Sequence, residues 1–393
     1  STEGNNTITV TATDKAANQQ QTAVTVVRDT TTPVASISAP TDGSFTNQTS
    51  ATVEGTFTEA NLSAITVNGV AATVSGNTFS ASVPLNIEGE NTLAVNISDL
   101  AGNSATSQVS VTRDTTNPVA TVTAPTDGTF TNQTTMTVTG QITEANLEQV
   151  AVNGVTATLT GNEFSATVPL NNEGANNISV VATDKAGNSG STQISVSRDT
   201  TSPVVTINSP VAGAYTNSSS IAVSGQFTET NIGSIAINGV TATLTGNTFV
   251  ATIPLSGEGN VTLTATATDL ANNTGTDELT IVRDTTNPVI TINTPAEGSF
   301  TNATSTTVTG EVTESHLASV EVNGVTATVS GNTFTASVPL NTEGENTLTV
   351  LAADLAGNSS SQTRMVRRDT TPPAISNVAP ANSTWHQTSS LTI

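Results

Sequence analysis

The chain repeats itself at a fixed interval of 85 positions. An arginine-aspartate pair followed by two threonines begins at Arg28, Arg113, Arg198, Arg283 and Arg368. No insertion or deletion interrupts the interval, and a constant period of this kind is typical of a modular array. A sequence that presents every surface several times favours a structural role over one built around a single active site.

The period divides the chain into four complete modules with a partial module at each end. The complete modules are 29–113, 114–198, 199–283 and 284–368. Residues 1–28 match the last third of a module, and residues 369–393 match the first third, with Trp385 at the place of Phe45. This is the pattern expected of a window from a longer array or of an arbitrary cut.

Composition excludes several classes of partner. Nine basic and 31 acidic residues give a net charge of −22, spread over all modules, whereas nucleic-acid binding needs clustered Lys and Arg. The acidity suits solubility and cation binding instead. Cysteine is absent, so disulfides and thiol chemistry are excluded. No apolar run approaches the roughly 18 residues that span a bilayer, so we expect no membrane insertion within this segment.

Short runs of period-two alternation predict an all-β fold. In the first complete module the runs are 35–37, 51–57, 65–67, 70–74, 79–85, 93–97 and 109–111. Asn68-Gly69 is typical of a two-residue hairpin turn, because both residues tolerate positive φ. Seven short strands predict an immunoglobulin-like β-sandwich without its disulfide, and hence a linear array of such sandwiches. A parallel β-solenoid is the alternative, although its repeats are usually far shorter.

The motifs also carry a family resemblance. They are Asp-Thr-Thr-Asn-Pro-Val at 114–119, Val-Asn-Gly-Val at 152–155, Gly-Asn-Glu-Phe at 161–164 and Thr-Asp-Lys-Ala-Gly-Asn at 183–188. Together they resemble the tandem bacterial immunoglobulin-like modules of large secreted surface adhesins, and are similar to the accessory domain B of glucodextranase-type enzymes. The resemblance implies an extracellular bacterial or archaeal rod. In some such adhesins calcium near the module junctions stiffens the array.

Recurring carboxylates independently predict a metal site at each junction. Asp29 lies in the linker, while Glu59 and Asp99 have the inward parity of their strands and should lean over the same pole. Three crowded carboxylates repel one another unless a cation joins them, and hard oxygen ligands favour Ca²⁺ over zinc. The predicted ligands, module by module, are Asp29, Glu59 and Asp99; Asp114, Glu144 and Asp184; Asp199, Glu229 and Asp269; and Asp284, Glu314 and Asp354.

Other interpretations of the same acids stay open. Asp and Asn beside Gly or Pro commonly form turns, and Glu59 could cap a loop. Arg113 could instead pair with the acids of the next linker. Glu88 also recurs in all four modules, at the opposite pole, where it could reach the following linker or only bond its own loop.

Further side chains give weaker signals. His316 and His386 each occur in one copy without a second histidine at ligand spacing, which favours exposed loop residues. Glu59 and Asp99 could be imagined as a glycosidase pair, but no aromatic-lined cleft accompanies them. Phe79 alternates with small residues, as a core side chain does.

The repeated modules and the family resemblance together predict a non-catalytic spacer or stalk of an extracellular, cell-surface adhesin or filament, stiffened by Ca²⁺. Its expected partners are the neighbouring modules and, in a filament or matrix, other copies of the chain. A glycan-binding or homophilic adhesion array is one alternative, and an accessory region of a polysaccharide-degrading enzyme is another.

Overall fold

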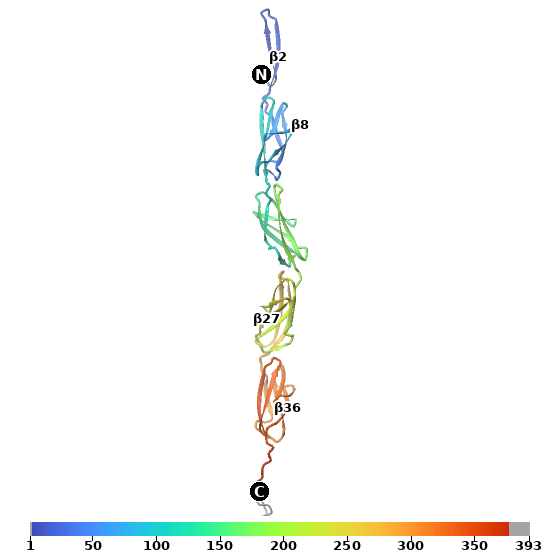
Figure 1. The fold of residues 1–393 in the computed structure, drawn as a ribbon, viewed down its shortest axis with the longest axis vertical. Coiled ribbons are helices and arrows are strands. Elements are labelled where there is room, and N and C mark those ends of the chain that lie inside the picture. The colour runs from blue at the N-terminus through green and yellow to red at the C-terminus, as the bar shows by residue number, and fades with distance from the viewer. Residues whose placement is uncertain (1, 377–393) are drawn as a thin grey trace, which may run out of the picture. The chain divides into compact units, whose positions relative to one another are not determined.

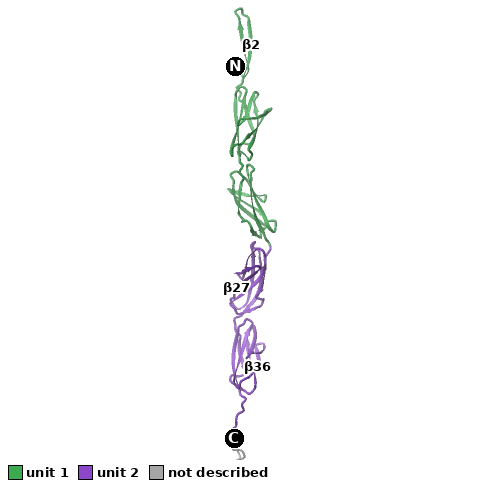
Figure 2. Cartoon of the chain, in the orientation of Figure 1, with its two compact units in different colours: residues 1–200 green, residues 201–393 purple. Residues whose placement is uncertain are grey.

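Every element of the described residues is a β-strand (Figure 1). The structure, a computed structural model, describes residues 2–376. Most of the partial module expected at 369–393, with Trp385 and His386, lies outside this range. The chain divides into two units, residues 1–200 and residues 201–393 (Figure 2). No helix in the described part of the chain is long and apolar enough to cross a membrane.

The first unit begins with a lone hairpin. Strands β1 (Gly4–Thr13) and β2 (Gln19–Arg28) pair antiparallel, with Gly4 opposite Arg28. This pairing matches the last two strands of a complete module, in which Gly89 lies opposite Arg113. Residues 1–28 therefore adopt the strand pairing that their sequence match predicts.

Each complete module is a sandwich of a four-stranded and a five-stranded sheet. Residues 29–113 form β3 (Val34–Ala39), β4 (Ser44–Thr46), β5 (Ser50–Thr58), β6 (Leu62–Val67), β7 (Val70–Ala71), β8 (Thr73–Ser75), β9 (Thr78–Pro84), β10 (Gly89–Asp99) and β11 (Ser104–Arg113). The strand orders are β3-β5-β9-β8 and β4-β11-β10-β6-β7. All neighbours are antiparallel except β4 and β11, which are parallel. This is the all-β, immunoglobulin-like sandwich that the alternation predicts.

The same nine strands recur in the following three modules. Residues 114–198 form β12 (Val119–Ala124), β13 (Thr129–Thr131), β14 (Thr135–Thr143), β15 (Leu147–Val152), β16 (Val155–Thr156), β17 (Thr158–Thr160), β18 (Glu163–Pro169), β19 (Gly174–Asp184) and β20 (Ser189–Arg198). Residues 199–283 form β21 (Val204–Ser209), β22 (Tyr215–Thr216), β23 (Ser220–Thr228), β24 (Ile232–Ile237), β25 (Val240–Thr241), β26 (Thr243–Thr245), β27 (Thr248–Pro254), β28 (Gly259–Asp269) and β29 (Thr274–Arg283). Residues 284–368 form β30 (Val289–Thr294), β31 (Ser299–Thr301), β32 (Ser305–Thr313), β33 (Leu317–Val322), β34 (Val325–Thr326), β35 (Thr328–Ser330), β36 (Thr333–Pro339), β37 (Gly344–Asp354) and β38 (Ser359–Arg368).

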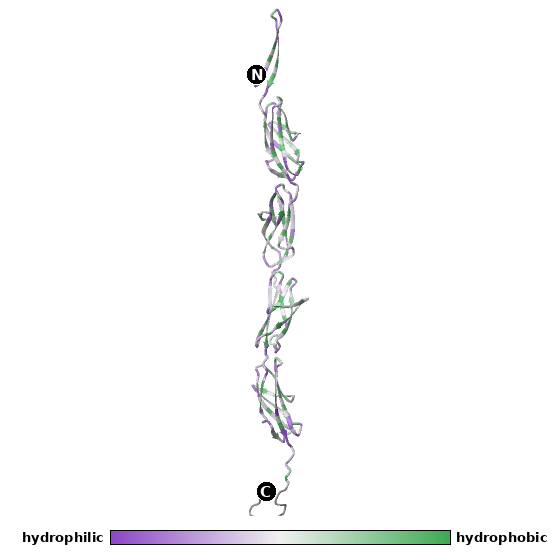
Figure 3. Cartoon of the chain, turned by 90° about the vertical axis from the view of Figure 1, so that its left-hand side faces the viewer, coloured by the Kyte–Doolittle hydropathy of each residue, from purple (hydrophilic) through white to green (hydrophobic). Residues whose placement is uncertain are grey.

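Alternation along the strands builds a separate core in each module. Figure 3 shows hydrophobic and hydrophilic residues alternating along the ribbons. In the first complete module Val53, Phe79 and Leu93 are buried between the two sheets, while the residues beside them face solvent. Phe79 is 2% exposed, so its expected core position is confirmed. Each core closes within its own module because every described sheet uses strands of one module only.

The hairpin turn at Asn68-Gly69 has the predicted conformation. Both residues have positive φ, 47° and 83°, and they join Val67 directly to Val70. Positive φ at both central positions is the requirement of the tight turn that Asn-Gly favours. The sequence therefore fixes the register of this hairpin locally.

Two details differ from the expected seven strands. The run at 70–74 divides into β7 and β8, which belong to different sheets, so Val74 is 41% exposed instead of facing the core. The chain crosses between the sheets at Ala72, whose N–H donates to Ile65 O at 2.9 Å. The short strand β4 is also additional, and its parallel pairing with β11 brings Phe45 beside the end of the module.

Candidate metal centre

The predicted acidic residues meet at one pole of each of the first two complete modules. Asp29 lies in the linker before β3, Glu59 follows β5, and Asp99 ends β10. One carboxylate oxygen from each lies within 4.8 Å of the others. The same separation holds for Asp114, Glu144 and Asp184. Each cluster thus gathers the oxygen ligands that Ca²⁺ prefers.

The turn after β19 fixes the carboxylate of Asp184, which is 2% exposed. The backbone N–H groups of Ala186 and Asn188 donate to its Oδ1 at 2.9 and 2.8 Å. The side-chain amide of Asn188 donates to Oδ2 at 2.7 Å. Three donors therefore orient this carboxylate within its own turn.

The linker carboxylate and Glu144 are joined through Asn146. The side-chain amide of Asn146 donates to Asp114 Oδ2 at 3.0 Å, and its backbone N–H donates to Glu144 Oε1 at 2.8 Å. Asp114 Oδ1 accepts the backbone N–H of Thr116 at 3.1 Å. These bonds hold the two acids side by side.

The asparagine amide also lowers the pKa of the turn aspartate. In the first module the side-chain amide of Asn103 holds the pKa of Asp99 below its ordinary value, against the opposing effect of burial, and the Asn103 backbone N–H adds to the lowering. Asp14 in the lone hairpin is bonded in the same way by Asn18, and its pKa is also lowered. Since that hairpin lacks a counterpart of Glu59, the aspartate has a turn-forming role that does not depend on the cluster.

Three junction arginines pair with the glutamate at the Glu88 position of their own module. Arg113 Nη1 lies 3.2 Å from Glu88 Oε2, and Arg198 and Arg283 pair with the equivalent Glu173 and Glu258. The alternative pairing of Arg113 with the acids of the next linker is therefore wrong. Among the described residues, no ion pair joins a basic side chain to an acid of the first two clusters.

The third and fourth predicted sets differ from the first two. The third is divided between the two units, because Asp199 belongs to the first and Glu229 and Asp269 to the second. In the fourth module the converging group is Asp284, Glu314 and His316. Asp354 holds the turn position, where Asn358 donates to both of its oxygens at 2.8 and 2.7 Å.

His316 lies in the loop between β32 and β33, as the sequence favours, but its side chain is only 36% exposed and has specific partners. Its Nδ1 lies 3.1 Å from Asp284 Oδ2, and its ring lies 4.9 Å from the ring of Tyr215 in β22. These partners are distant in sequence, so the spacing of histidines could not reveal the contact. His386 lies outside the described residues.

Glu88 proves to be the residue that holds the following linker. Its carboxylate accepts the Thr115 backbone N–H at 2.5 Å and the Thr115 hydroxyl at 3.2 Å, beside Arg113. In the equivalent bonds a threonine backbone N–H donates to a glutamate carboxylate. The pairs are Thr30 and Glu3, Thr200 and Glu173, Thr285 and Glu258, and Thr370 and Glu343. We call the group of Arg113, Glu88 and Thr115, and its equivalents, a linker clamp. The recurrence of Glu88 in every module was the sequence signal for it.

Asn188 is a second residue that contacts the junction. Its sequence context indicated only an ordinary turn. Besides Asp184, its amide donates to the linker carbonyl of Asp114 at 2.8 Å and accepts from Asn47 of the preceding module at 3.3 Å. Lys185 of the same turn lies over the ring of Phe45, 5.5 Å from its centre. One turn therefore contacts the linker and the preceding module at once.

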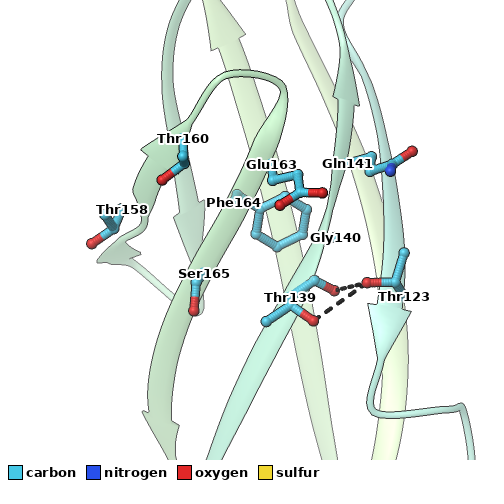
Figure 4. A pocket seen from close by; sticks show the side chains of 9 residues that line it. All are labelled: Thr123, Thr139, Gly140, Gln141, Thr158, Thr160, Glu163, Phe164 and Ser165. Carbon is cyan, nitrogen blue, oxygen red and sulfur yellow. Dashed lines mark hydrogen bonds between the residues drawn. The ribbon is translucent and has the colours of Figure 1, made fainter.

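A separate hollow lies on the four-stranded sheet of the second module (Figure 4). It measures about 410 Å³ and is lined mainly by hydroxyl-bearing side chains, with Thr123 donating to the Thr139 carbonyl at 3.1 Å. Phe164 borders it but is only 1% exposed, because its ring packs inward against Gly140. A sugar would find no exposed aromatic face here on which to stack.

These features define a class of protein: a tandem array of immunoglobulin-like β-sandwich modules. More specifically, the chain belongs to the family described as glucodextranase, domain B, which matches residues 33–115, 118–200, 203–285 and 288–370. The four matches recur at the sequence period and cover most of the chain. The expected family resemblance is thus confirmed.

Individual relatives share parts of this array. A stretch of 160 residues is 39% identical to bacillopeptidase F of Bacillus subtilis (strain 168), covering 39% of this chain and 11% of that protein. Among solved structures, a tetra-tandem repeat from the extending region of a large adhesion protein is 21% identical with a TM-score of 0.34, covering 86% of this chain and 100% of the other. An I-band fragment of titin is 10% identical with a TM-score of 0.38, covering 65% and 100%.

Proposed function

We propose that the chain is a structural spacer in an extracellular, cell-surface protein such as an adhesin or filament, and that the modules themselves are not catalytic. The modules are bounded at Asp29, Asp114, Asp199 and Asp284 in this proposal. Membership in a domain family with tandem immunoglobulin-like modules supports it. A spacer needs modules that fold independently and junctions that limit bending.

The bonding of the linker at 114–118 carries the proposal. Glu88 of the preceding module binds Thr115, while Asn146 and Asn188 of the following module bind Asp114. A flexible tether is rich in Gly and Ser and is free of such bonds. A linker bonded from both sides instead transmits the orientation of one module to the next.

We further propose that Ca²⁺ stiffens the junctions. The proposed ligands are the twelve acids that the sequence predicts. The first two clusters support this assignment, because Arg113 pairs with Glu88 and not with an acid of either cluster. Calcium sites of extracellular modules have dissociation constants on the order of 10⁻⁴–10⁻³ M. Binding joins linker and loops, so it adds stability by mass action.

Chelation tests this proposal at the junction before residue 114. Spin labels at exposed Thr73 and Thr158 report the distance distribution between the two modules, and calorimetry reports Ca²⁺ binding. We expect chelation to broaden the distribution and Glu144→Gln to reproduce this with Ca²⁺ present. Glu163→Gln, which removes an equal charge outside the cluster, is the matched control. If millimolar Ca²⁺ neither binds nor narrows the distribution, the calcium assignment is wrong and the acids are turn formers.

A further inference from the structure

The fourth module has a histidine where the other three complete modules have an asparagine. His316 occupies the position of Asn61, Asn146 and Asn231. In the second module this position donates an amide N–H to the linker carboxylate, and an amide nitrogen has no lone pair to offer a metal. The imidazole of His316 keeps the same contact through Nδ1, 3.1 Å from Asp284 Oδ2, but it can also act as a ligand.

Besides Asp284, two residues position His316. Glu314 Oε1 accepts the His316 backbone N–H at 3.0 Å, and the Tyr215 ring packs against the imidazole with a tilt of 53°. His316, Asp284 and Glu314 line one open surface hollow of about 580 Å³. A hydrated ion therefore has access to all three side chains.

We propose that Asp284, Glu314 and His316 form a site for a borderline divalent transition ion of the Zn²⁺ class. Imidazole nitrogen suits zinc, copper, iron and nickel, whereas calcium takes six to eight oxygens. The inference rests on the proposed function in one respect, namely that the acids at a junction bind a cation. It assigns this one junction a different ion from the others.

The geometry fits three protein ligands and one open position. Zn–N and Zn–O bonds of about 2.0–2.2 Å place tetrahedral ligands about 3.3 Å apart. The Nδ1–Oδ2 separation of 3.1 Å is near that value, and all three ligand atoms lie within 4.8 Å of one another. A metal ion binds the lone pair of Nδ1, so it replaces the hydrogen bond between Nδ1 and Oδ2. Water completes the coordination from the open hollow.

The test is a titration of the whole chain with Co²⁺, whose visible absorption reports its ligands, and with Zn²⁺ by calorimetry. We expect one equivalent to bind the natural chain, and His316→Asn to weaken this binding about tenfold or more. His316→Asn introduces the asparagine that the other three complete modules have at this position, so we expect it to preserve the fold. The reciprocal Asn146→His should create a second equivalent, and His386→Asn is the control for the other histidine of the chain.

Each outcome decides the assignment. Loss of Co²⁺ binding in His316→Asn together with gain in Asn146→His supports it, even if no junction binds Ca²⁺ and the calcium proposal fails. Unchanged Co²⁺ binding in His316→Asn overturns it, as does the absence of Co²⁺ and Zn²⁺ binding at millimolar concentration. Calcium binding at the first two junctions is measured separately, so the two proposals fail independently.

Discussion

Asn188 and Asn358 make the same set of bonds in two modules. Each amide group donates to a turn aspartate and to a linker carbonyl, and each amide oxygen accepts from an asparagine of the preceding module. Only an amide combines two donors and an acceptor in so small a group. Aspartate at these positions would lose both donors and add charge beside Asp184 or Asp354.

Asp42 illustrates how a single carboxylate links stability to pH. The Ser110 backbone N–H, with its hydroxyl, lowers the pKa of Asp42 through bonds of 2.8 and 3.0 Å. The lowered pKa means that the folded state binds this proton less readily than the unfolded chain. Ionised Asp42 therefore stabilises the folded state above the ordinary aspartate pKa of about 3.9. This stabilisation is lost as the pH falls through the lower pKa of the folded state.

We expect the melting temperature of the first complete module to fall in this acidic range. In Asp42→Ala, which introduces the residue found at Ala212 in the third module, the fall should be smaller. Calorimetry from pH 7 downward measures the melting temperatures of the natural chain and of the variant. At pH 7 Asp42 is ionised in the folded and in the unfolded state, so the measurement starts above the range in which its protonation matters. An identical pH profile for the two chains would show that Asp42 does not contribute.

At the scale of the element, the linker clamp joins the end of β11 to the loop before β10. Arg113 and Glu88 lie at these two places, and the backbone of Thr115 is bonded between them. The clamp therefore fixes the backbone of the linker at Thr115 against the end of the hairpin, although the linker is not a strand. Its recurrence in the lone hairpin, where Glu3 binds Thr30, shows that the two strands suffice to form it.

Hydrogen exchange at the Thr115 amide tests the clamp. A bond to a charged group contributes about 1.5–3 kcal/mol, and partial exposure of Glu88 reduces this. We therefore expect Glu88→Ala to speed exchange of the Thr115 amide about tenfold. Glu88→Gln, which keeps an acceptor oxygen, should have a smaller effect. Unchanged exchange in Glu88→Ala would mean that the linker is ordered by other contacts.

Sequence reasoning succeeded where local chemistry decides the structure. The Asn68-Gly69 turn, the alternating strands and the pole at which Glu59 and Asp99 meet all follow from short-range pattern and strand count. The division of 70–74 between two sheets did not, because it depends on which neighbours Val74 finds across the sandwich. The junction contacts of His316 were hidden because its partners, Asp284 in the linker and Tyr215 in the preceding module, are distant in sequence.

At the scale of the whole molecule, separate cores predict separate unfolding. Phe79 is 2% exposed and packs in a core confined to its own module. Phe79→Ala should cost that module about 3–5 kcal/mol, while modules without the change keep their melting temperatures. Calorimetry should show one transition displaced downward from the rest.

Phe300 provides the matched control for this substitution. It is the same residue type but is 70% exposed, so Phe300→Ala should change stability by less than about 0.5 kcal/mol. If Phe79→Ala lowered every transition together, the modules would be unfolding as one cooperative body. If it lowered none, the inward position of Phe79 would be wrong.

Confinement of each sheet to one module also matters while the protein is being made. Neighbouring modules have such similar strands that a strand of one could replace its equivalent in the next, the usual misassembly of repeat proteins. A ribosome adds about 5–20 residues per second, so roughly 4–17 s separate successive modules. Sandwiches of this kind fold in milliseconds to seconds. Each module can therefore bury its strands before a competing copy emerges, and the order of synthesis protects a repetitive sequence from its own similarity.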